Sequence, residues 1–90
     1  KKVKTEFNSK FRKHYKSRIV NNTKLLSRTE DRIRLFKLNP QNPILKDHQL
    51  TGDKKEFRAF WITGDIRIMY FPVSKQEVLF IDIGTHNQVY

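Results

Sequence analysis

The spacing of the apolar residues changes midway along this chain, and that change limits its possible folds more than any other feature. Phe7, Phe11, Tyr15 and Ile19 recur at every fourth position, which places them along one face of a helix. From Glu56 onward, apolar residues alternate with the others, which is the period of a β-strand. Helices followed by strands predict an α+β fold.

Two helices are predicted in the first half of the chain, each with a polar residue suited to cap it. Asn8 or Ser9 can cap the first helix, and the Asn-Asn-Thr run at residues 21–23 ends it and caps the second. The second helix is expected over residues 24–38, because the residue before Pro40 avoids helical geometry. Its apolar stripe consists of Leu25, Leu26, Ile33 and Phe36.

Strands dominate the second half, and tight turns separate them. They are predicted at residues 57–62, 66–71 and 77–83, with turns at 63–65 and 72–76 and a weaker strand at residues 3–7. The two helices are expected to cover one face of this small twisted antiparallel sheet. The connection at residues 41–53 and the C-terminus are then left on the opposite face, where they would form a concave surface.

Positive charge is concentrated in the helical half of the chain. The net charge is +10, and residues 1–46 carry fourteen Lys or Arg against three acidic residues, whereas residues 47–90 carry five against six. This asymmetry favours a polyanionic partner such as RNA, DNA, a ribosome or an acidic protein. A surface that only keeps the protein soluble is the alternative. With 90 residues, the chain is expected to form one domain over residues 1–90.

The composition also excludes several kinds of site. There is no cysteine, so neither a disulfide nor a thiolate metal site is possible, which fits a reducing, cytoplasmic environment. No segment approaches the ~18 consecutive apolar residues of a membrane-spanning helix. The three histidines are scattered without the spacing of metal ligands, so neither a metal nor another cofactor is expected.

The last seven residues, Gly-Thr-His-Asn-Gln-Val-Tyr, combine a strand break with groups that can transfer protons. Gly84 interrupts the apolar run of the third strand, and His86 and Tyr90 follow within one turn's reach of each other. Both side chains can move protons, and histidine does so near neutral pH without help. In a small and very basic protein, such groups at a strand end suggest chemistry on a phosphate backbone.

An ordered set of segments in the second half resembles the RelE/ParE toxin superfamily, most closely its YafQ branch. The set covers most of residues 44–90, whereas the helical half agrees only in layout. Its members are Asp47-His48-Gln49-Leu50-Thr51-Gly52, Phe57-Arg58, Asp65-Ile66-Arg67-Ile68-Met69-Tyr70, Gly84-Thr85-His86 and Val89-Tyr90.

The resemblance implies the toxin of a type II toxin–antitoxin module, with the two-helix and small-sheet fold of microbial RNase toxins. Such toxins are endoribonucleases that cut mRNA, many of them in the ribosomal decoding site. A cognate antitoxin wraps and blocks the toxin, which implies a hetero-oligomer. A ParE-like toxin that binds a protein such as DNA gyrase, or an inactive remnant that binds only antitoxin, are the alternatives.

Carried over residue by residue, the resemblance implies a metal-free acid/base site. His86 and His48 would handle protons, and Arg58, beside His86, would stabilise the charge on phosphorus. Asp65 and Tyr90 would position groups or assist. The RNA-binding residues expected around them are Lys46, Lys54, Lys55 and Arg67.

Each candidate residue also has a purely structural interpretation. His48 and His14 suit exposed surface positions, Asp65 suits the hairpin turn itself, and Tyr90 suits base stacking or anchoring of the terminus. Trp61 stands where YafQ-type toxins carry a second strand histidine. Because tryptophan does not transfer protons, this departure leaves the division of acid and base roles open.

Overall fold

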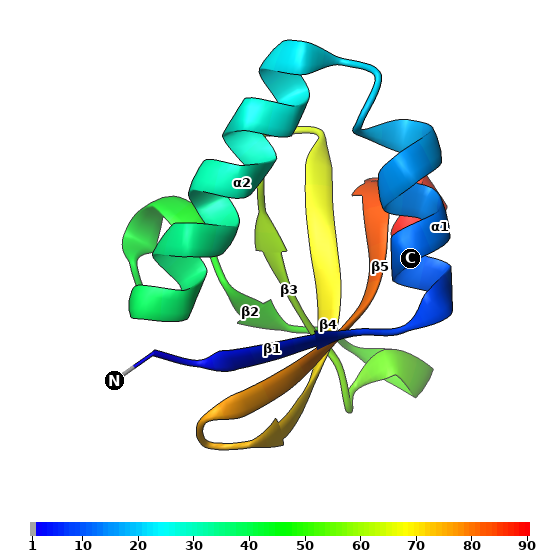
Figure 1. Ribbon diagram of the computed structural model, residues 1–90. Coiled ribbons are helices and arrows are strands. Elements are labelled where there is room, and N and C mark those ends of the chain that lie inside the picture. Colours follow the sequence, from blue (N-terminus) through cyan, green and yellow to red (C-terminus); the bar gives the residue numbers. More distant parts are fainter. Residues whose placement is uncertain (1) are drawn as a thin grey trace.

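The computed structural model describes residues 2–90, which form three α-helices and one five-stranded sheet (Figure 1). The helices are α1 (Ser9–Arg18), α2 (Thr23–Leu38) and α3 (His86–Val89). The strands are β1 (Lys4–Phe7), β2 (His48–Gln49), β3 (Arg58–Trp61), β4 (Ile66–Ser74) and β5 (Glu77–Thr85). The predicted α+β fold is therefore confirmed, and α3 is an additional helix at the C-terminus.

The caps predicted from the sequence begin both long helices. The side-chain oxygen of Asn8 accepts a hydrogen bond from the backbone N–H of Phe11 at 2.8 Å, and that of Asn22 accepts one from Leu25 at 3.0 Å. Each bond satisfies one of the backbone donors that a helix start leaves free. No helix within residues 2–90 combines the length and the apolar character needed to cross a lipid bilayer.

The sheet has the order β1-β5-β4-β3-β2, and it is mixed rather than wholly antiparallel. The β3–β4 and β4–β5 pairs are antiparallel, as expected, and so is the β2–β3 pair, but β1 pairs with β5 in parallel. Short hairpins can join only antiparallel strands, whereas β1 reaches β5 through both helices and most of the chain, so no hairpin sets its direction. The two-residue strand β2 was not predicted, because two residues are too few to show an alternating pattern.

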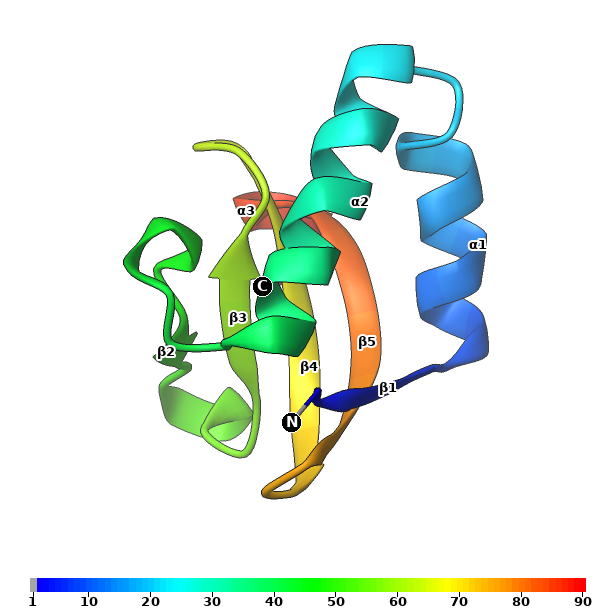
Figure 2. The same ribbon diagram turned by 60° about the vertical axis from the view of Figure 1, so that its left-hand side comes forward.

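Helices α1 and α2 lie together over one face of the sheet, whereas α3 lies on the other side, and β2 is the edge strand next to β3 (Figures 1 and 2). The covered face holds the main core, in which the rings of Phe36 and Phe60 stack with centroids 4.4 Å apart. Phe36, Phe60 and Phe80 are all fully buried. We call this side the covered face.

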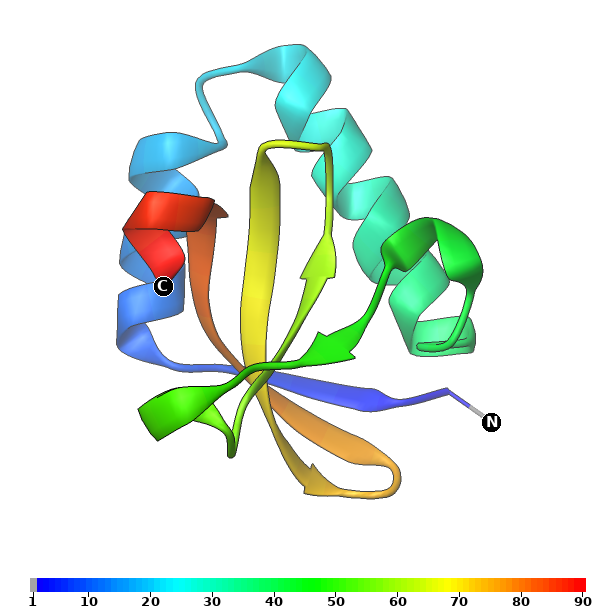
Figure 3. The same ribbon diagram turned by 180° about the vertical axis from the view of Figure 1, so that it is seen from behind.

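The opposite side of the sheet, seen in Figure 3, holds only a small apolar cluster. Its buried members are Leu50, Ala59, Met69 and Val89, against which Phe57, Ile81 and Tyr90 pack. Neither long helix of the described residues 2–90 lies on this side, so polar side chains at its margins reach the surface. The concave surface expected here is thus formed by β2, the following loop and α3, and we call this side the open face.

Candidate active site

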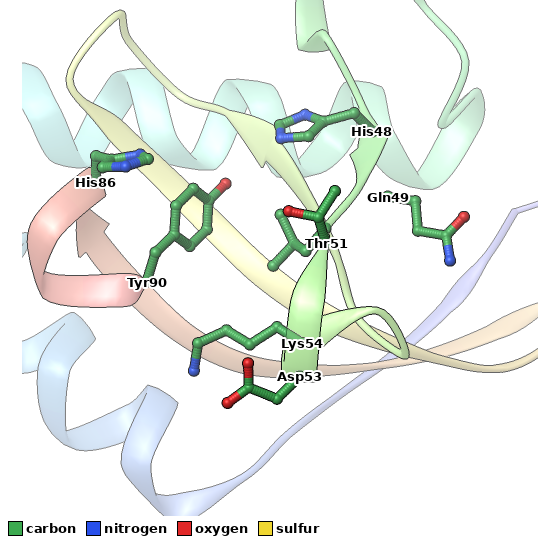
Figure 4. A pocket seen from close by; sticks show the side chains of 8 residues that line it. His48, Gln49, Thr51, Asp53, Lys54, His86 and Tyr90 are labelled. Carbon is green, nitrogen blue, oxygen red and sulfur yellow. The ribbon is translucent and has the colours of Figure 1, made fainter.

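A pocket of about 470 Å³ lies on the open face and contains both candidate catalytic histidines (Figure 4). Ligand sites in proteins commonly have volumes of about 300–1,000 Å³. The pocket brings the connection after α2 together with the C-terminus, two segments that are far apart in the sequence. Its lining consists of His48, Gln49, Leu50, Thr51, Asp53, Lys54, His86 and Tyr90.

Strand β2 places His48 at the pocket. His48 is in register with Ala59 of β3, and its exposed ring extends toward the Tyr90 side of the pocket in Figure 4. The ring atom Nδ1 lies 2.9 Å from the carbonyl oxygen of Lys46. Because a carbonyl can only accept, Nδ1 carries the proton, and in the neutral ring Nε2 keeps its lone pair. His48 therefore has the tautomer of a base whose acceptor atom is Nε2.

The short helix α3 places His86 and Tyr90 side by side. Thr85 caps α3 through the backbone N–H of Gln88, and the Gln88 side chain returns a hydrogen bond to the backbone N–H of Thr85 at 2.8 Å. This reciprocal cap stabilises a helix of only four residues. The rings of His86 and Tyr90 meet edge to face, with centroids 4.5 Å apart.

Tyr90 is held in its neutral form. Burial raises the pKa of its hydroxyl, and the nearby positive charge of Arg67 opposes part of that rise. With a pKa above the ordinary tyrosine value of about 10, the hydroxyl keeps its proton near neutral pH. Tyr90 is therefore suited to donate a hydrogen bond or to stack, but not to act as a base.

Arg67 lies between two aromatic rings beside the pocket. Its guanidinium carbon is 5.0 Å from the centre of the Trp61 ring and 5.8 Å from that of Tyr90. The ammonium group of Lys46 lies 5.5 Å from the Trp61 ring as well. These distances are within the range of cation–π attraction. Trp61 therefore gathers two cations, Lys46 and Arg67, on the open face.

The contact of Trp61 with Arg67 follows from the hairpin that joins β3 to β4. The two residues are a cross-strand pair in the register, equally far from Gly64 in the turn. Arg67 also donates a hydrogen bond to the carbonyl of Gly64 at 2.9 Å. Sequence reasoning placed Arg67 only among general RNA contacts, although counting outward from the predicted turn would have paired it with Trp61.

The expectation that Arg58 lies beside His86 is wrong. Side chains alternate along a strand, so Arg58 points to the covered face with Phe60, whereas Ala59 and Trp61 face the other way. Arg58 lines a different pocket, of about 490 Å³, together with Asp47.

Asp47 binds groups on the covered face rather than orienting His48. Its Oδ1 atom accepts a hydrogen bond from the Tyr70 hydroxyl at 2.8 Å and lies 3.4 Å from Nε of Arg58. Partial burial lowers the pKa of Arg58, but the charge and hydrogen bonding of Asp47 and Tyr70 together outweigh burial and raise that pKa overall. We call Asp47, Arg58 and Tyr70 the covered-face triad.

The remaining predicted residues are divided between the pocket and its surroundings. Lys54 lines the pocket, whereas Lys55 is exposed and does not line it. Asp65 is exposed in the hairpin turn, where its backbone N–H bonds the Thr63 hydroxyl, and it does not line the pocket either. The register of Ile66 with Thr85 nevertheless puts Asp65 at the same end of the sheet as His86.

The charges around the pocket are mainly positive and not neutralised by ion pairs. Within residues 2–90, no ion pair includes Lys46, Lys54 or Arg67. Asp53 is the acidic residue in the lining. No group of three or more His, Cys, Asp or Glu side chains in that part of the chain is arranged to hold a metal ion. The site therefore offers imidazoles, a phenol and cations, which suits an anionic substrate.

Solved structures of bacterial toxins share this fold. YafQ from E. coli strain BL21(DE3) has a TM-score of 0.80 at 21% identity, with 98% of each chain covered. A copper-bound mutant toxin from Helicobacter pylori has a TM-score of 0.75 at 26% identity, with 98% of this chain and 99% of that one covered. A chain of the E. coli DinJ–YafQ toxin–antitoxin complex has a TM-score of 0.75 at 19% identity, with 100% and 99% covered.

The sequence itself also matches a known family, although no curated protein matches it. The matching family is described as a bacterial toxin of type II toxin–antitoxin system, YafQ, and the match covers residues 3–90. The match includes both long helices, every strand and all of the lining of the open-face pocket. This chain therefore belongs to the YafQ family of toxins of bacterial type II toxin–antitoxin systems.

Proposed function

We propose that this toxin is an endoribonuclease that cleaves mRNA at the ribosome by acid/base chemistry that needs no metal ion. The observation that carries the proposal is the open-face pocket, in which His48, His86 and Tyr90 line one cavity. Cleavage of RNA requires a base, an acid and a cation near one phosphate. The pocket and Arg67 beside it supply all of these.

His48 is proposed as the base and His86 as the acid. Nε2 of neutral His48 takes the proton of the ribose 2′-OH, and the 2′-oxygen then bonds to phosphorus. The bond from phosphorus to the 5′-oxygen breaks, and protonated His86 donates its proton to that oxygen. The products are a 2′,3′-cyclic phosphate and a free 5′-OH. The bond from Nδ1 of His48 to the Lys46 carbonyl supports this assignment, because it leaves Nε2 as the acceptor.

Arg67 takes the role that the resemblance implied for Arg58. Nε of Arg67 and the hydroxyl of Tyr90 are both buried, and neither has a hydrogen-bond partner within residues 2–90. An anionic phosphate oxygen accepts from both kinds of donor. Catalytic hydrogen bonds often tighten only when substrate binds, so a small rotation of these side chains would bring them onto the phosphate. Lys54 adds a second positive charge at the pocket.

The basic surface of the helical half supports a large polyanionic partner. Lys10, Arg12, Lys13 and Lys16 are exposed on α1, and Lys24, Arg28 and Arg34 are exposed on α2. Cations of this kind raise affinity for RNA by releasing counterions. Ribosomal RNA in the cytoplasm is the polyanion we propose for the active toxin. A cognate antitoxin, as in the DinJ–YafQ complexes, is the partner proposed for the inhibited form.

The test is to map mRNA 5′ ends after incubation with purified ribosomes programmed with mRNA. The wild type is expected to create new ends with a 5′-OH, matched by upstream fragments that end in a 2′,3′-cyclic phosphate. His86→Ala is expected to lose the new ends, because it removes the acid.

Two outcomes would contradict the nuclease proposal. If wild type and His86→Ala arrest growth equally and neither cuts RNA, the toxin acts by binding a protein target. If neither protein is toxic, the chain is a remnant that binds antitoxin only. A Lys75→Ala variant serves as the control, because Lys75 is exposed and does not line the open-face pocket.

A further inference from the structure

A buried carboxylate lies between α1 and β5, outside the open-face pocket. The side chain of Asp82 is fully buried. Its Oδ1 atom lies 2.6 Å from Nδ1 of His14 and accepts a bond from the backbone N–H of Ile83 at 2.8 Å. A buried charge is costly unless it is paired, so Asp82 depends on the groups that surround it.

Those groups come from one face of α1. Lys10, His14 and Arg18 are spaced four residues apart, which aligns them along one side of the helix. Nζ of Lys10 lies 3.7 Å from Oδ2 of Asp82, and Nη1 of Arg18 lies 3.6 Å from Oδ1. The expectation that His14 is a simple surface residue is therefore wrong, since its side chain is only 20% exposed and bonds Asp82.

Arg18 extends this contact to the end of β5. Its Nη1 atom donates a hydrogen bond to the carbonyl of Ile83 at 2.8 Å. A Cβ atom at Gly84 would lie only 2.7 Å from the same Nη1 and 2.5 Å from Oε1 of Gln88. Arg18 and the Gln88 side chain of the α3 cap thus both pack against Gly84, in the space that a side chain there would fill.

His86 begins α3 two residues after Gly84, so the position of the strand end sets the position of His86. We propose that Lys10, His14, Arg18 and Asp82 form a positioning network that holds the end of β5 and thereby fixes His86 and Tyr90 in the pocket. None of the four lines that pocket, so they act through the strand end. The catalytic consequence rests on the proposed nuclease function, but the structural consequence does not.

The test compares Arg18→Gln with Lys13→Gln. Both variants remove one charge from α1, so any general effect of charge on RNA affinity appears in both. Only Arg18→Gln removes the bond to Ile83. Labelled toxin is examined by NMR through the imidazole resonances of His86 and the backbone amides of residues 85–90. Cleavage on programmed ribosomes gives kcat and KM, and thermal unfolding verifies the fold.

Arg18→Gln is expected to shift the His86 and Tyr90 resonances. It should also lower kcat roughly 10- to 100-fold, because small displacements of catalytic groups slow the chemical step. Its KM should match that of Lys13→Gln. Arg18→Lys, which keeps the charge, should restore part of the rate. Lys13→Gln should keep the wild-type resonances, and any change in its KM measures the general effect of removing one charge from α1.

Unchanged resonances and unchanged kcat in folded Arg18→Gln would overturn the positioning network. If Arg18→Gln does not fold, Arg18→Lys is compared with Lys13→Gln instead, because it keeps a charge near Asp82 but lacks Nη1, the atom that donates to the Ile83 carbonyl, and a smaller change in the same resonances is expected. If the wild type cuts no RNA, the proposed function fails, and the resonances alone decide whether the network positions His86.

Discussion

The two faces of the sheet use the same strands but treat polar groups in opposite ways. On the covered face, Asp47 lies within bonding distance of both Arg58 and Tyr70, and helices shield the core. On the open face, Lys54 and Arg67 have no acidic partner within residues 2–90. On the covered face, the pairing of Asp47 with Arg58 and Tyr70 therefore contributes to stability. On the open face, the cations Lys54 and Arg67 are not paired with a carboxylate of the described residues.

Two tyrosines show the same difference. Burial raises the pKa of both hydroxyls. An arginine opposes part of the rise in each case, Arg58 for Tyr70 and Arg67 for Tyr90, but only for Tyr70 does a carboxylate, Asp47, raise the pKa further. Tyr70 is fixed in a structural triad, and Tyr90 stands among cations at the pocket. Substitutions on the covered face should therefore change stability, and those on the open face should change activity.

The largest effect is expected from His48→Gln on the open face. Loss of a general base typically slows a reaction by ~10²–10⁴-fold. Because His48 is exposed, the free energy of unfolding should stay within about 0.5 kcal/mol of the wild type. Cleavage rates on programmed ribosomes and urea unfolding measure both quantities. A variant that cleaves at the wild-type rate would remove His48 from the proposed mechanism.

The neighbouring residues Phe60 and Trp61 provide a direct comparison of the two faces. Phe60 is fully buried under α2, so Phe60→Ala should cost about 3–5 kcal/mol in the free energy of unfolding. Trp61 is only half-buried on the open face, so Trp61→Ala should cost less stability but reduce cleavage by releasing Arg67. Urea unfolding of both variants measures the losses of stability, and cleavage on programmed ribosomes measures the activity of Trp61→Ala. Equal losses of stability in the two variants would contradict the contrast between the faces.

The two strand arginines sharpen the comparison further. Arg58→Gln leaves the partly buried Asp47 without its cation and should cost about 1–3 kcal/mol of stability, with the cleavage rate of the surviving folded protein unchanged. Arg67→Gln should instead reduce cleavage roughly 10- to 100-fold with a smaller loss of stability. Unfolding and cleavage assays on both variants test this. If Arg58→Gln lost more cleavage than Arg67→Gln, Arg58 and not Arg67 would be the residue that stabilises the phosphate.

The smallest effect concerns the alkaline limit of stability. The raised pKa of Tyr70 contributes stability that is fully present below the unfolded tyrosine value of about 10 and is lost as pH rises toward the folded value. Tyr70→Phe should cost about 1 kcal/mol at neutral pH, because it removes the bond to Asp47. It should also lose less stability than the wild type between about pH 10 and 12. Urea unfolding across that range measures the slope, and parallel curves would contradict the assignment.

Local features of the fold were predictable because each depends on nearby residues. Asn8 and Asn22 cap the helices as expected, and the turn at residues 63–65 joins two strands. Strand β4 runs on to Ser74, three residues beyond its expected end, because Pro72 is accommodated next to an irregular register. The parallel pairing of β1 depends on a strand most of the chain away, so no local pattern indicated it.

The candidate site was only partly predictable for the same reason. His48, His86 and Tyr90 do share a pocket, and Lys54 lines it with them. Alternation along β3 already separated Arg58 from Trp61, but it did not say which face the helices would cover. That choice decided that Trp61 and Arg67 belong to the open face and Arg58 to the structural triad.

The order of residues along the chain was sufficient to predict the helix and strand periods, the caps, the turns, the excess of positive charge and the presence of proton-transferring groups. Which cation pairs with which anion became clear only from the fold. His14 and Asp82, 68 positions apart, form a buried pair, whereas Asp47 turns away from adjacent His48 toward Tyr70. The reason is that the strength of an electrostatic or hydrogen-bonding contact depends on distance and burial in space, and not on separation along the chain.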